Sequence, residues 1–155
     1  MIKHILSVDD EPVISKLLAE VLTRIGYRVS AAAKPGEARR CVEMDPPQLI
    51  IMDCLIEEGD GFVLIDEFKK SLPNTPILLL TGFIFDGQVV RDIIHKKVDA
   101  YLNKTASLSS IVGEVQLLLG DPQDASFSAW KFHGGIPGAQ GGGGTAHFDQ
   151  AARSL

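Results

Sequence analysis

Short apolar runs alternate with segments of helical periodicity along the first 120 residues, and this alternation limits the fold to one class. The apolar runs lie at residues 5–8, 27–32, 49–52, 77–80 and 98–102. Segments with apolar residues on one helical face follow them, at 12–25, 35–44, 61–70, 89–94 and 108–119. Continuous runs such as Leu49-Ile50-Ile51-Met52 are typical of strands covered on both faces. Five strand–helix pairs predict an α/β fold, a five-stranded parallel sheet with helices on both faces.

The pattern ends near Gly120, which divides the chain into a predicted domain at 1–120 and a tail at 121–155. The tail holds seven glycines, including Gly141–Gly144, and has no sustained periodicity. Such a segment buries too little surface to offset its ordering entropy, so we expect it to be flexible. Its one apolar cluster, Phe127, Trp130 and Phe132, is either a docking motif or part of an inert tail.

Charge, hydropathy and cysteine content limit the partners and the location that this chain can have. The formal net charge is −5 and the pI is about 5.3, with no long basic run, which argues against nucleic acid as a direct partner. No apolar run approaches the ~20 residues that span a bilayer, so we expect no membrane insertion. The two cysteines, Cys41 and Cys54, form no disulfide or metal pattern, which favours a reducing, cytoplasmic location.

Polar side chains follow four of the predicted strands. They are Asp9 and Asp10, Asp53, Thr81 and Lys104. Functional groups of an open parallel sheet gather at the carboxyl ends of its strands. Three carboxylates there would repel one another unless a cation lay among them, and hard oxygen ligands suit Mg²⁺. A lysine and a threonine could then engage a phosphoryl group, so the set predicts phosphoryl transfer.

A plainer interpretation is that these residues only cap helices. Asp10, before Glu11-Pro12, could be a simple N-cap. Carboxylates after two strands, a hydroxyl after a third and a lysine after a fourth favour a functional site instead.

The motifs of residues 1–120 resemble those of receiver domains from bacterial two-component response regulators. The matching residues are Val8-Asp9-Asp10-Glu11-Pro12, Ile51-Met52-Asp53, Asp60-Gly61, Leu80-Thr81-Gly82 and Asp99-Ala100-Tyr101-Leu102-Asn103-Lys104. The resemblance implies the (βα)5 flavodoxin-like receiver fold. It also implies a signalling domain, not an enzyme in the usual sense, with autocatalytic phosphotransfer and slow autodephosphorylation.

The resemblance assigns a role to each site residue. Asp53 resembles the phosphoacceptor, which takes its phosphoryl group from a histidine kinase or a histidine phosphotransfer protein. Asp9, Asp10 and Asp53, with the backbone carbonyl of Leu55, resemble the Mg²⁺ ligands. Thr81 and Lys104 resemble the residues that engage the phosphoryl group. Tyr101 resembles the aromatic switch that turns inward when Thr81 shifts.

The resemblance also implies partners. We expect a downstream protein target, and a homodimer, through the face formed by the fourth helix, fifth strand and fifth helix. Two other functions stay open. One is a receiver-like docking module that is never phosphorylated. The other is a haloacid-dehalogenase-like phosphatase, although Asp9-Asp10-Glu11 lacks the Asp-x-Asp pattern of that class.

Several positions depart from the receiver pattern. Thr105 follows Lys104 where receivers usually have a cis proline, which leaves the loop either cis or trans. Glu57 stands where the family often has proline, in an acidic loop. In the family, the residues at the positions of Leu55 and Phe83 flank the path of the hydrolytic water. Neither of these two side chains can orient a water, so we predict a long-lived phosphorylated state. Cys54 is expected to be buried on the opposite side of its strand from Asp53 and inert.

Overall fold

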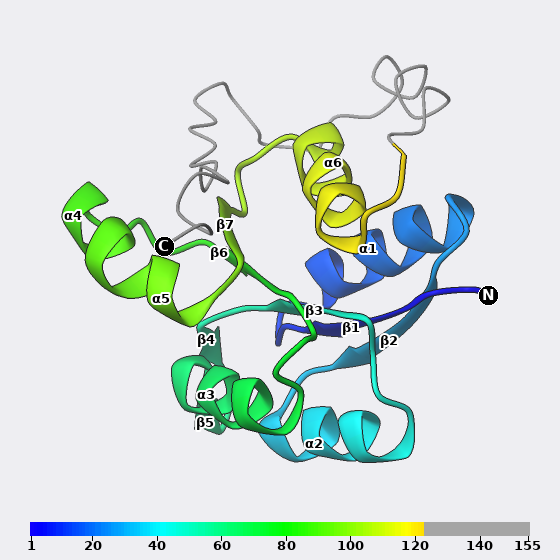
Figure 1. Ribbon diagram of the computed structural model, residues 1–155, viewed down its shortest axis with the longest axis horizontal. Helices are drawn as coiled ribbons and strands as arrows, with labels where there is room; N and C mark the ends of the chain where they lie inside the picture. Colours follow the sequence, from blue (N-terminus) through cyan, green and yellow to red (C-terminus); the bar gives the residue numbers. More distant parts are fainter. Residues whose placement is uncertain (123–155) are drawn as a thin grey trace.

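A five-stranded parallel sheet forms the centre of the protein (Figure 1). The computed structural model describes residues 1–122; the predicted tail, apart from Asp121 and Pro122, lies outside the described residues. The strands are β1 (His4–Val8), β2 (Arg28–Ala32), β3 (Leu49–Met52), β6 (Ile77–Thr81) and β7 (Ala100–Asn103), in the order β2-β1-β3-β6-β7. Every neighbouring pair is parallel, so the predicted sheet is confirmed.

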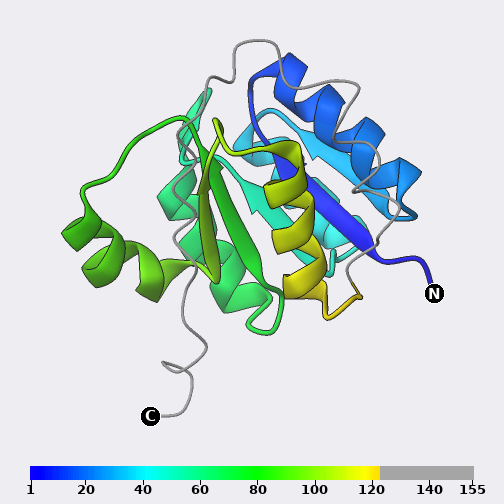
Figure 2. The same cartoon turned by 90° about the horizontal axis from the view of Figure 1, so that it is seen from above.

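Helices cover both faces of this sheet (Figures 1 and 2). One face carries α1 (Pro12–Arg24) and α6 (Leu108–Leu119), and the other carries α2 (Pro35–Met44) and α3 (Gly61–Ser71). The predicted helix near residues 89–94 is a composite of α4 (Gly87–Val89), the π-helical η1 (Val90–Ile94) and α5 (His95–Lys97). This composite helix packs on the same face as α2 and α3.

Alternation along each strand sorts the apolar residues into two cores. Ile5, Ile51 and Leu78 face α1 and α6, while their neighbours Leu6, Ile50 and Leu79 face α2 and α3. All six are at most 2% exposed. A sheet buried on both faces explains why these strands are continuously apolar rather than alternating.

The helix ends follow local sequence signals. Pro12 begins α1, and Gly26, at a φ of +106°, lies just beyond its end. Asp60 caps α3 by accepting a hydrogen bond from the Phe62 N–H at 2.8 Å. Gly120 ends α6 in the left-handed conformation, at a φ of +68°.

Several boundaries shift by one to three residues from the sequence prediction, and one small element was not predicted. Strand β7 begins at Ala100 instead of residue 98, because the Val98 N–H still donates to the Ile94 carbonyl at the end of the helix. Strand β2 begins at Arg28, one residue after the predicted start. The acidic loop after Asp53 is a short antiparallel hairpin of β4 (Leu55–Ile56) and β5 (Gly59–Asp60), which the apolar pattern does not reveal.

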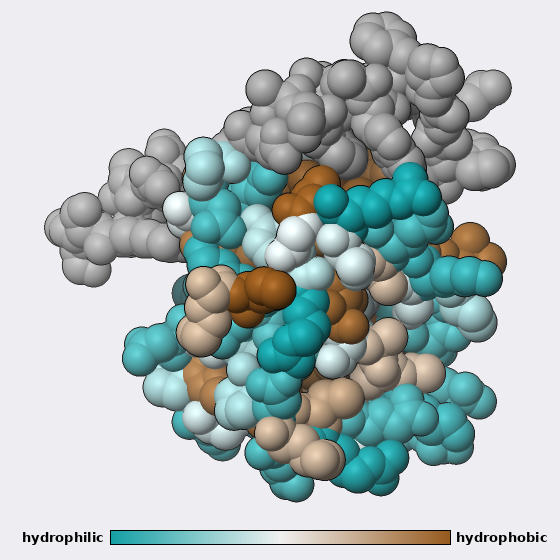
Figure 3. Space-filling model, turned by 90° about the vertical axis from the view of Figure 1, so that its right-hand side faces the viewer, coloured by the Kyte–Doolittle hydropathy of each residue, from teal (hydrophilic) through white to brown (hydrophobic). Residues whose placement is uncertain are grey.

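The amino ends of the strands meet at one edge of the sheet, here called the amino edge, and the carboxyl ends meet at the opposite carboxyl edge. Figure 3 views the molecule from the side of the N-terminus, where hydrophilic residues cover much of the surface between smaller hydrophobic groups. Within residues 1–122, no helix is both long enough and apolar enough to cross a membrane.

Candidate phosphoryl-transfer site

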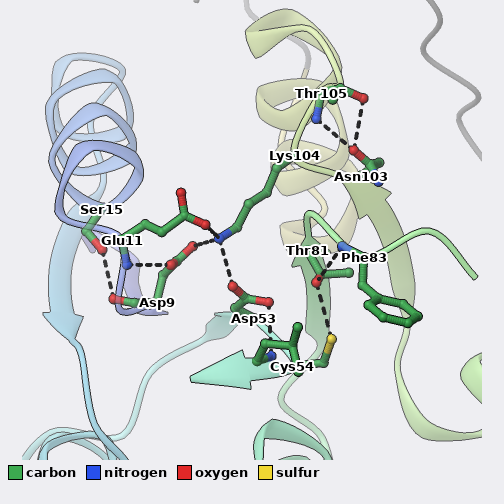
Figure 4. Close-up of polar contacts among 11 residues, drawn as sticks. Asp9, Glu11, Ser15, Asp53, Cys54, Thr81, Phe83, Asn103, Lys104 and Thr105 are labelled. Carbon is green, nitrogen blue, oxygen red and sulfur yellow. Dashed lines mark hydrogen bonds and ion pairs between the residues drawn. The ribbon is translucent and has the colours of Figure 1, made fainter. Parts of the chain in front are cut away.

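All five polar residues predicted from the strand ends meet at the carboxyl edge. Asp9 and Asp10 follow β1, Asp53 follows β3, Thr81 ends β6 and Lys104 follows β7. Because β1, β3, β6 and β7 are consecutive neighbours in the sheet, their ends lie side by side. Figure 4 shows the resulting site, with the Lys104 amine between the carboxylates from the first and third strands.

Three carboxylates gather within the site. Oxygen atoms of Asp9, Asp10 and Asp53 all lie within 4.8 Å of one another. The Asp9 and Asp53 side chains are each only 5% exposed, and Asp10 is half-buried. Hard carboxylate oxygens at this spacing fit a divalent cation such as Mg²⁺, which takes one or two carboxylates and completes its shell with water or phosphate oxygens.

Lys104 is the cation of this cluster. Its Nζ lies 2.8 Å from Asp9 Oδ2, 2.7 Å from Asp53 Oδ2 and 2.6 Å from Glu11 Oε1, and its side chain is 9% exposed. Burial alone would lower the pKa of Lys104, but hydrogen bonds to Asp53, Asp9 and Glu11 outweigh it and raise the pKa above its ordinary value. The amine is therefore charged at neutral pH.

Asp9 has the opposite balance. Burial raises its pKa above the ordinary value, and the hydrogen bonds from Lys104 and the Glu11 N–H offset this only in part. The pKa of Lys104 is raised by its ion pairs, while the pKa of Asp9 is raised although its carboxylate accepts from Lys104. Both follow from the geometry, because one ammonium group shares its charge among several carboxylates and fully compensates none of them.

Asp10 is not the N-cap of α1. The N-cap is Glu11, whose side chain makes no capping hydrogen bond, and the Glu11 N–H donates to Asp9 Oδ1 at 2.9 Å. The interpretation of Asp10 as a simple cap is therefore wrong. The same geometry brings Glu11 to Lys104, a contact that sequence reasoning missed although Glu11 lies within the quoted motif.

Thr81 and Cys54 form a buried polar contact below the acidic cluster. Their side chains come from neighbouring strand ends, and Cys54 Sγ lies 3.2 Å from Thr81 Oγ1. The Thr81 hydroxyl also accepts a hydrogen bond from the Phe83 N–H at 3.2 Å. Cys54 is 4% exposed, which confirms its predicted burial, and burial raises the pKa of its thiol. The contact with Thr81 was not foreseen.

Tyr101 points into the protein. It is 8% exposed, and its hydroxyl donates to the Phe83 carbonyl at 3.1 Å. Its ring meets Phe85 edge to face at 5.8 Å, and Phe85 also contacts Phe83 and Phe62. The Tyr101 ring is therefore inward in this structure, and its role as a switch stays a prediction.

The loop after Lys104 is ordered without a proline. No peptide bond in residues 1–122 is cis, so the Lys104–Thr105 bond is trans. Asn103 Oδ1 instead accepts hydrogen bonds from both the N–H and the hydroxyl of Thr105, each at 2.9 Å. Figure 4 shows this turn beside Lys104, which reaches Asp53 despite the missing proline.

The acidic hairpin stays outside the carboxylate cluster. Glu57 and Glu58 are exposed, and Glu58, at a φ of +63°, pairs with Lys34 at 3.0 Å. Asp60 is the N-cap of α3. Glu57 and Glu58 are therefore solvated and Asp60 is structural, so these residues add negative charge near the site without taking part in its contacts.

The chain matches the family model described as "Response regulator receiver domain" over residues 5–116. It is 30% identical over 130 residues to the transcriptional regulatory protein GlrR of Escherichia coli, covering 83% of this chain and 29% of that protein. It is also 30% identical over 134 residues to the probable transcriptional regulator ycf27 of Cyanophora paradoxa, covering 85% and 54%. The chain thus spans about a third to a half of these relatives.

Solved structures agree with these matches. A CheY-like receiver domain protein from Methanospirillum hungatei superposes with a TM-score of 0.71 at 24% identity, covering 77% of this chain and 95% of that one. The response regulator TrrA from Thermotoga maritima, determined in complex with Mg(2+)-BeF, has a TM-score of 0.67 at 29% identity, covering 76% and 99%. The first likeness supports the receiver fold, and the second also comes from a protein with a bound magnesium complex.

Proposed function

The chain is a member of the response regulator receiver family, and from this premise we propose that Asp53 accepts a phosphoryl group in a Mg²⁺-dependent reaction. The observation that carries the proposal is the carboxylate cluster of Asp9, Asp10 and Asp53, in which Asp9 and Asp53 share the ammonium group of Lys104. Membership of the receiver family also favours this function over the haloacid-dehalogenase alternative.

The donor is the phosphohistidine of a kinase or a histidine phosphotransfer protein. A carboxylate oxygen of Asp53 attacks the phosphorus atom, the phosphorus–nitrogen bond breaks, and its electron pair returns to the imidazole. The product is an acyl phosphate on Asp53. Little covalent assistance is needed in such a transfer, since positioning and charge neutralisation supply most of the catalysis.

Asp9, Asp10 and Asp53 would hold the magnesium ion, together with the backbone carbonyl of Leu55. A magnesium ion held there would neutralise charge on the transferred phosphoryl group. Lys104 now lies 2.7 Å from Asp53 Oδ2, and we expect its amine to follow the new charge onto a phosphoryl oxygen. Thr81 donates a hydrogen bond to another phosphoryl oxygen.

Phosphorylation then acts by population shift. Tyr101 is connected to Thr81 through Phe83, whose N–H donates to the Thr81 hydroxyl and whose carbonyl accepts from the Tyr101 hydroxyl. A movement of Thr81 therefore changes the support of Tyr101 and of the loop before α4.

The output is a protein–protein contact in the cytoplasm, through the face of the composite helix, β7 and α6. The target is a downstream protein, and the same face could join two copies of the chain. The net charge of −5 supports a protein partner over direct contact with nucleic acid.

The phosphorylated state is expected to last minutes or more. Leu55 is 62% exposed and Phe83 50% exposed beside the acceptor, and neither side chain can hydrogen-bond an attacking water. The double variant Leu55→Asn, Phe83→Glu should shorten the half-life of the adduct. An unchanged hydrolysis rate in that variant contradicts this expectation.

Intact-mass measurement after incubation with acetyl phosphate tests the proposal. One phosphoryl adduct should form with Mg²⁺, and none should form in EDTA or in Asp53→Asn. The matched control Asp45→Asn, which removes an exposed carboxylate at the amino edge, should behave as the wild type. Without an adduct from either acetyl phosphate or a phosphorylated histidine phosphotransfer protein, the docking-module alternative is favoured.

A further inference from the structure

Cys54 occupies an unusual place in the site. Cys54 is 4% exposed and Thr81 is 1% exposed, and the Cys54 thiol lies 3.2 Å from the Thr81 hydroxyl (Figure 4). The proposed acceptor Asp53 is the residue directly before Cys54, and the two side chains form hydrogen bonds with different residues. Asp53 Oδ2 bonds Lys104, whereas Cys54 bonds the residue that we propose to engage the phosphoryl group.

The two partners of Thr81 fix its hydroxyl. A hydroxyl group has one proton to donate and two acceptor positions, and the Phe83 N–H occupies one acceptor position. The thiol then either accepts a hydrogen bond from the Thr81 hydroxyl or donates one to its second acceptor position. In both cases the Thr81 side chain, which has few χ1 rotamers, loses a hydrogen bond when it turns toward another partner.

We propose that Cys54 is a positioning residue that holds the Thr81 hydroxyl in its present orientation and opposes its turn toward a phosphoryl group on Asp53. The inference rests on the proposed phosphorylation of Asp53. The phosphoryl group has to compete with the thiol for Thr81, so the residue at position 54 sets how readily the phosphorylated arrangement forms. A thiol, which is a weak hydrogen-bonding group, makes this restraint a mild one.

The test compares hydrogen-bonding and non-bonding residues at position 54. Cys54→Ala and Cys54→Val both remove the bond, alanine with a loss of volume and valine with a gain. Cys54→Ser replaces the thiol with a stronger hydrogen-bonding group and, like alanine, is smaller than cysteine. The rate of adduct formation with acetyl phosphate and Mg²⁺ is measured for each folded variant, beside the control Cys41→Ala at the other cysteine.

Cys54→Ala and Cys54→Val should each raise the rate about threefold, and Cys54→Ser should lower it about threefold, as expected for one hydrogen bond. Cys41→Ala should match the wild type. In a Thr81→Val background the differences at position 54 should vanish, because the residue acts through the Thr81 hydroxyl.

The results distinguish failure of the proposed function from failure of this inference. If the wild type forms no adduct, the proposed function fails and this inference fails with it. If the wild type forms the adduct but alanine, valine and serine shift the rate in one direction, Cys54 affects packing only and the inference alone is overturned. Differences that persist with Thr81→Val also overturn it.

Discussion

Carboxylates are paired with cations differently at the two edges of the sheet. At the amino edge each carboxylate has its own cation: Asp45 pairs with Arg28, Asp99 with Lys69 at 2.5 Å, and Asp121 with Lys3 at 2.5 Å. At the carboxyl edge a single ammonium group, that of Lys104, serves Asp9, Glu11 and Asp53, and Asp10 adds a further carboxylate to the cluster.

The pKa values follow this contrast. Hydrogen bonds from Arg28 and Lys3 lower the pKa values of Asp45 and Asp121, respectively, so their charged forms are favoured. Burial raises the pKa of Asp9, so its charged form is disfavoured in the folded protein. Ion pairs thus neutralise these carboxylates at the amino edge. The carboxyl edge keeps a surplus of negative charge that a bound cation can balance.

The largest expected effect is a difference in the rate of adduct formation between two lysine variants, one at each edge. Lys104→Met removes the cation next to Asp53 and should slow adduct formation with acetyl phosphate about a hundredfold or more, since a positioned charge is lost from the reaction. Lys69→Met removes the partner of Asp99 at the amino edge and should change the rate by less than about twofold, because this pair lies at the opposite ends of the strands from Asp53. Equal slowing in both variants would remove the functional contrast between the edges.

The next effect concerns the backbone beneath the acceptor. A Cβ atom at Gly61 would lie 2.3 Å from the Asp53 carbonyl oxygen and 2.6 Å from Cys54 Cα, and backbone atoms cannot yield easily. Gly61→Ala should lower the free energy of unfolding by about 2 kcal/mol. Gly36→Ala, in α2 with no atom within 4 Å of the added Cβ, should be neutral or stabilising in the same urea titration. Equal stabilities of the two variants would contradict the close packing under Asp53.

Magnesium should stabilise the folded protein through the carboxyl edge only. At ten times its Kd, Mg²⁺ adds about 1.4 kcal/mol to the free energy of unfolding, because it binds the folded state. Thermal unfolding should show this increase in the wild type and in Asp99→Asn, and should lose it in Asp10→Asn. A magnesium effect that survives in Asp10→Asn would place the ion elsewhere.

The smallest effect is a difference in the sign of pH dependence, measured without metal. The folded pKa of Asp9 lies above its ordinary 3.8, so its contribution to stability is present below 3.8 and is lost as pH rises through the folded pKa. The folded pKa of Asp121 lies below 3.8, so its contribution is present above 3.8 and is lost as pH falls through the folded pKa.

Urea titrations of Asp9→Asn and Asp121→Asn against the wild type would reveal the two slopes. The Asp121 difference should stay below about 1 kcal/mol, as for other partly exposed ion pairs. Slopes of the same sign would contradict the contrast between the edges.

Much of this architecture could be predicted from the sequence. Runs such as Leu49–Met52 mark buried strands because burial on both faces demands continuous apolar residues. The parallel order then brings Asp9, Asp53 and Lys104 to one edge, since the carboxyl ends of parallel strands lie together. The bounds of α2 and β3 agree with the prediction to the residue.

The remainder depends on tertiary contacts that have no periodic signal. The Cys54–Thr81 contact joins side chains from two strand ends, and periodicity does not predict which atoms meet. The hairpin at 55–60 is too short to show alternation, and the π-helical turn at Val90–Ile94 keeps the same apolar spacing as an ordinary helix. The contact of Glu11 with Lys104 lies at the entry to α1, where the Glu11 N–H also donates to Asp9, and neither bond follows from sequence spacing.

Locating the phosphoryl group tests the central claim most directly. The wild type is incubated with acetyl phosphate and Mg²⁺, the acyl phosphate is reduced with borohydride, and peptide mass spectrometry identifies the modified carboxyl group. The account predicts modification of Asp53 alone, with none when magnesium is removed. Modification of a different residue, or an unmodified Asp53 after reaction with a phosphorylated histidine donor, would contradict it.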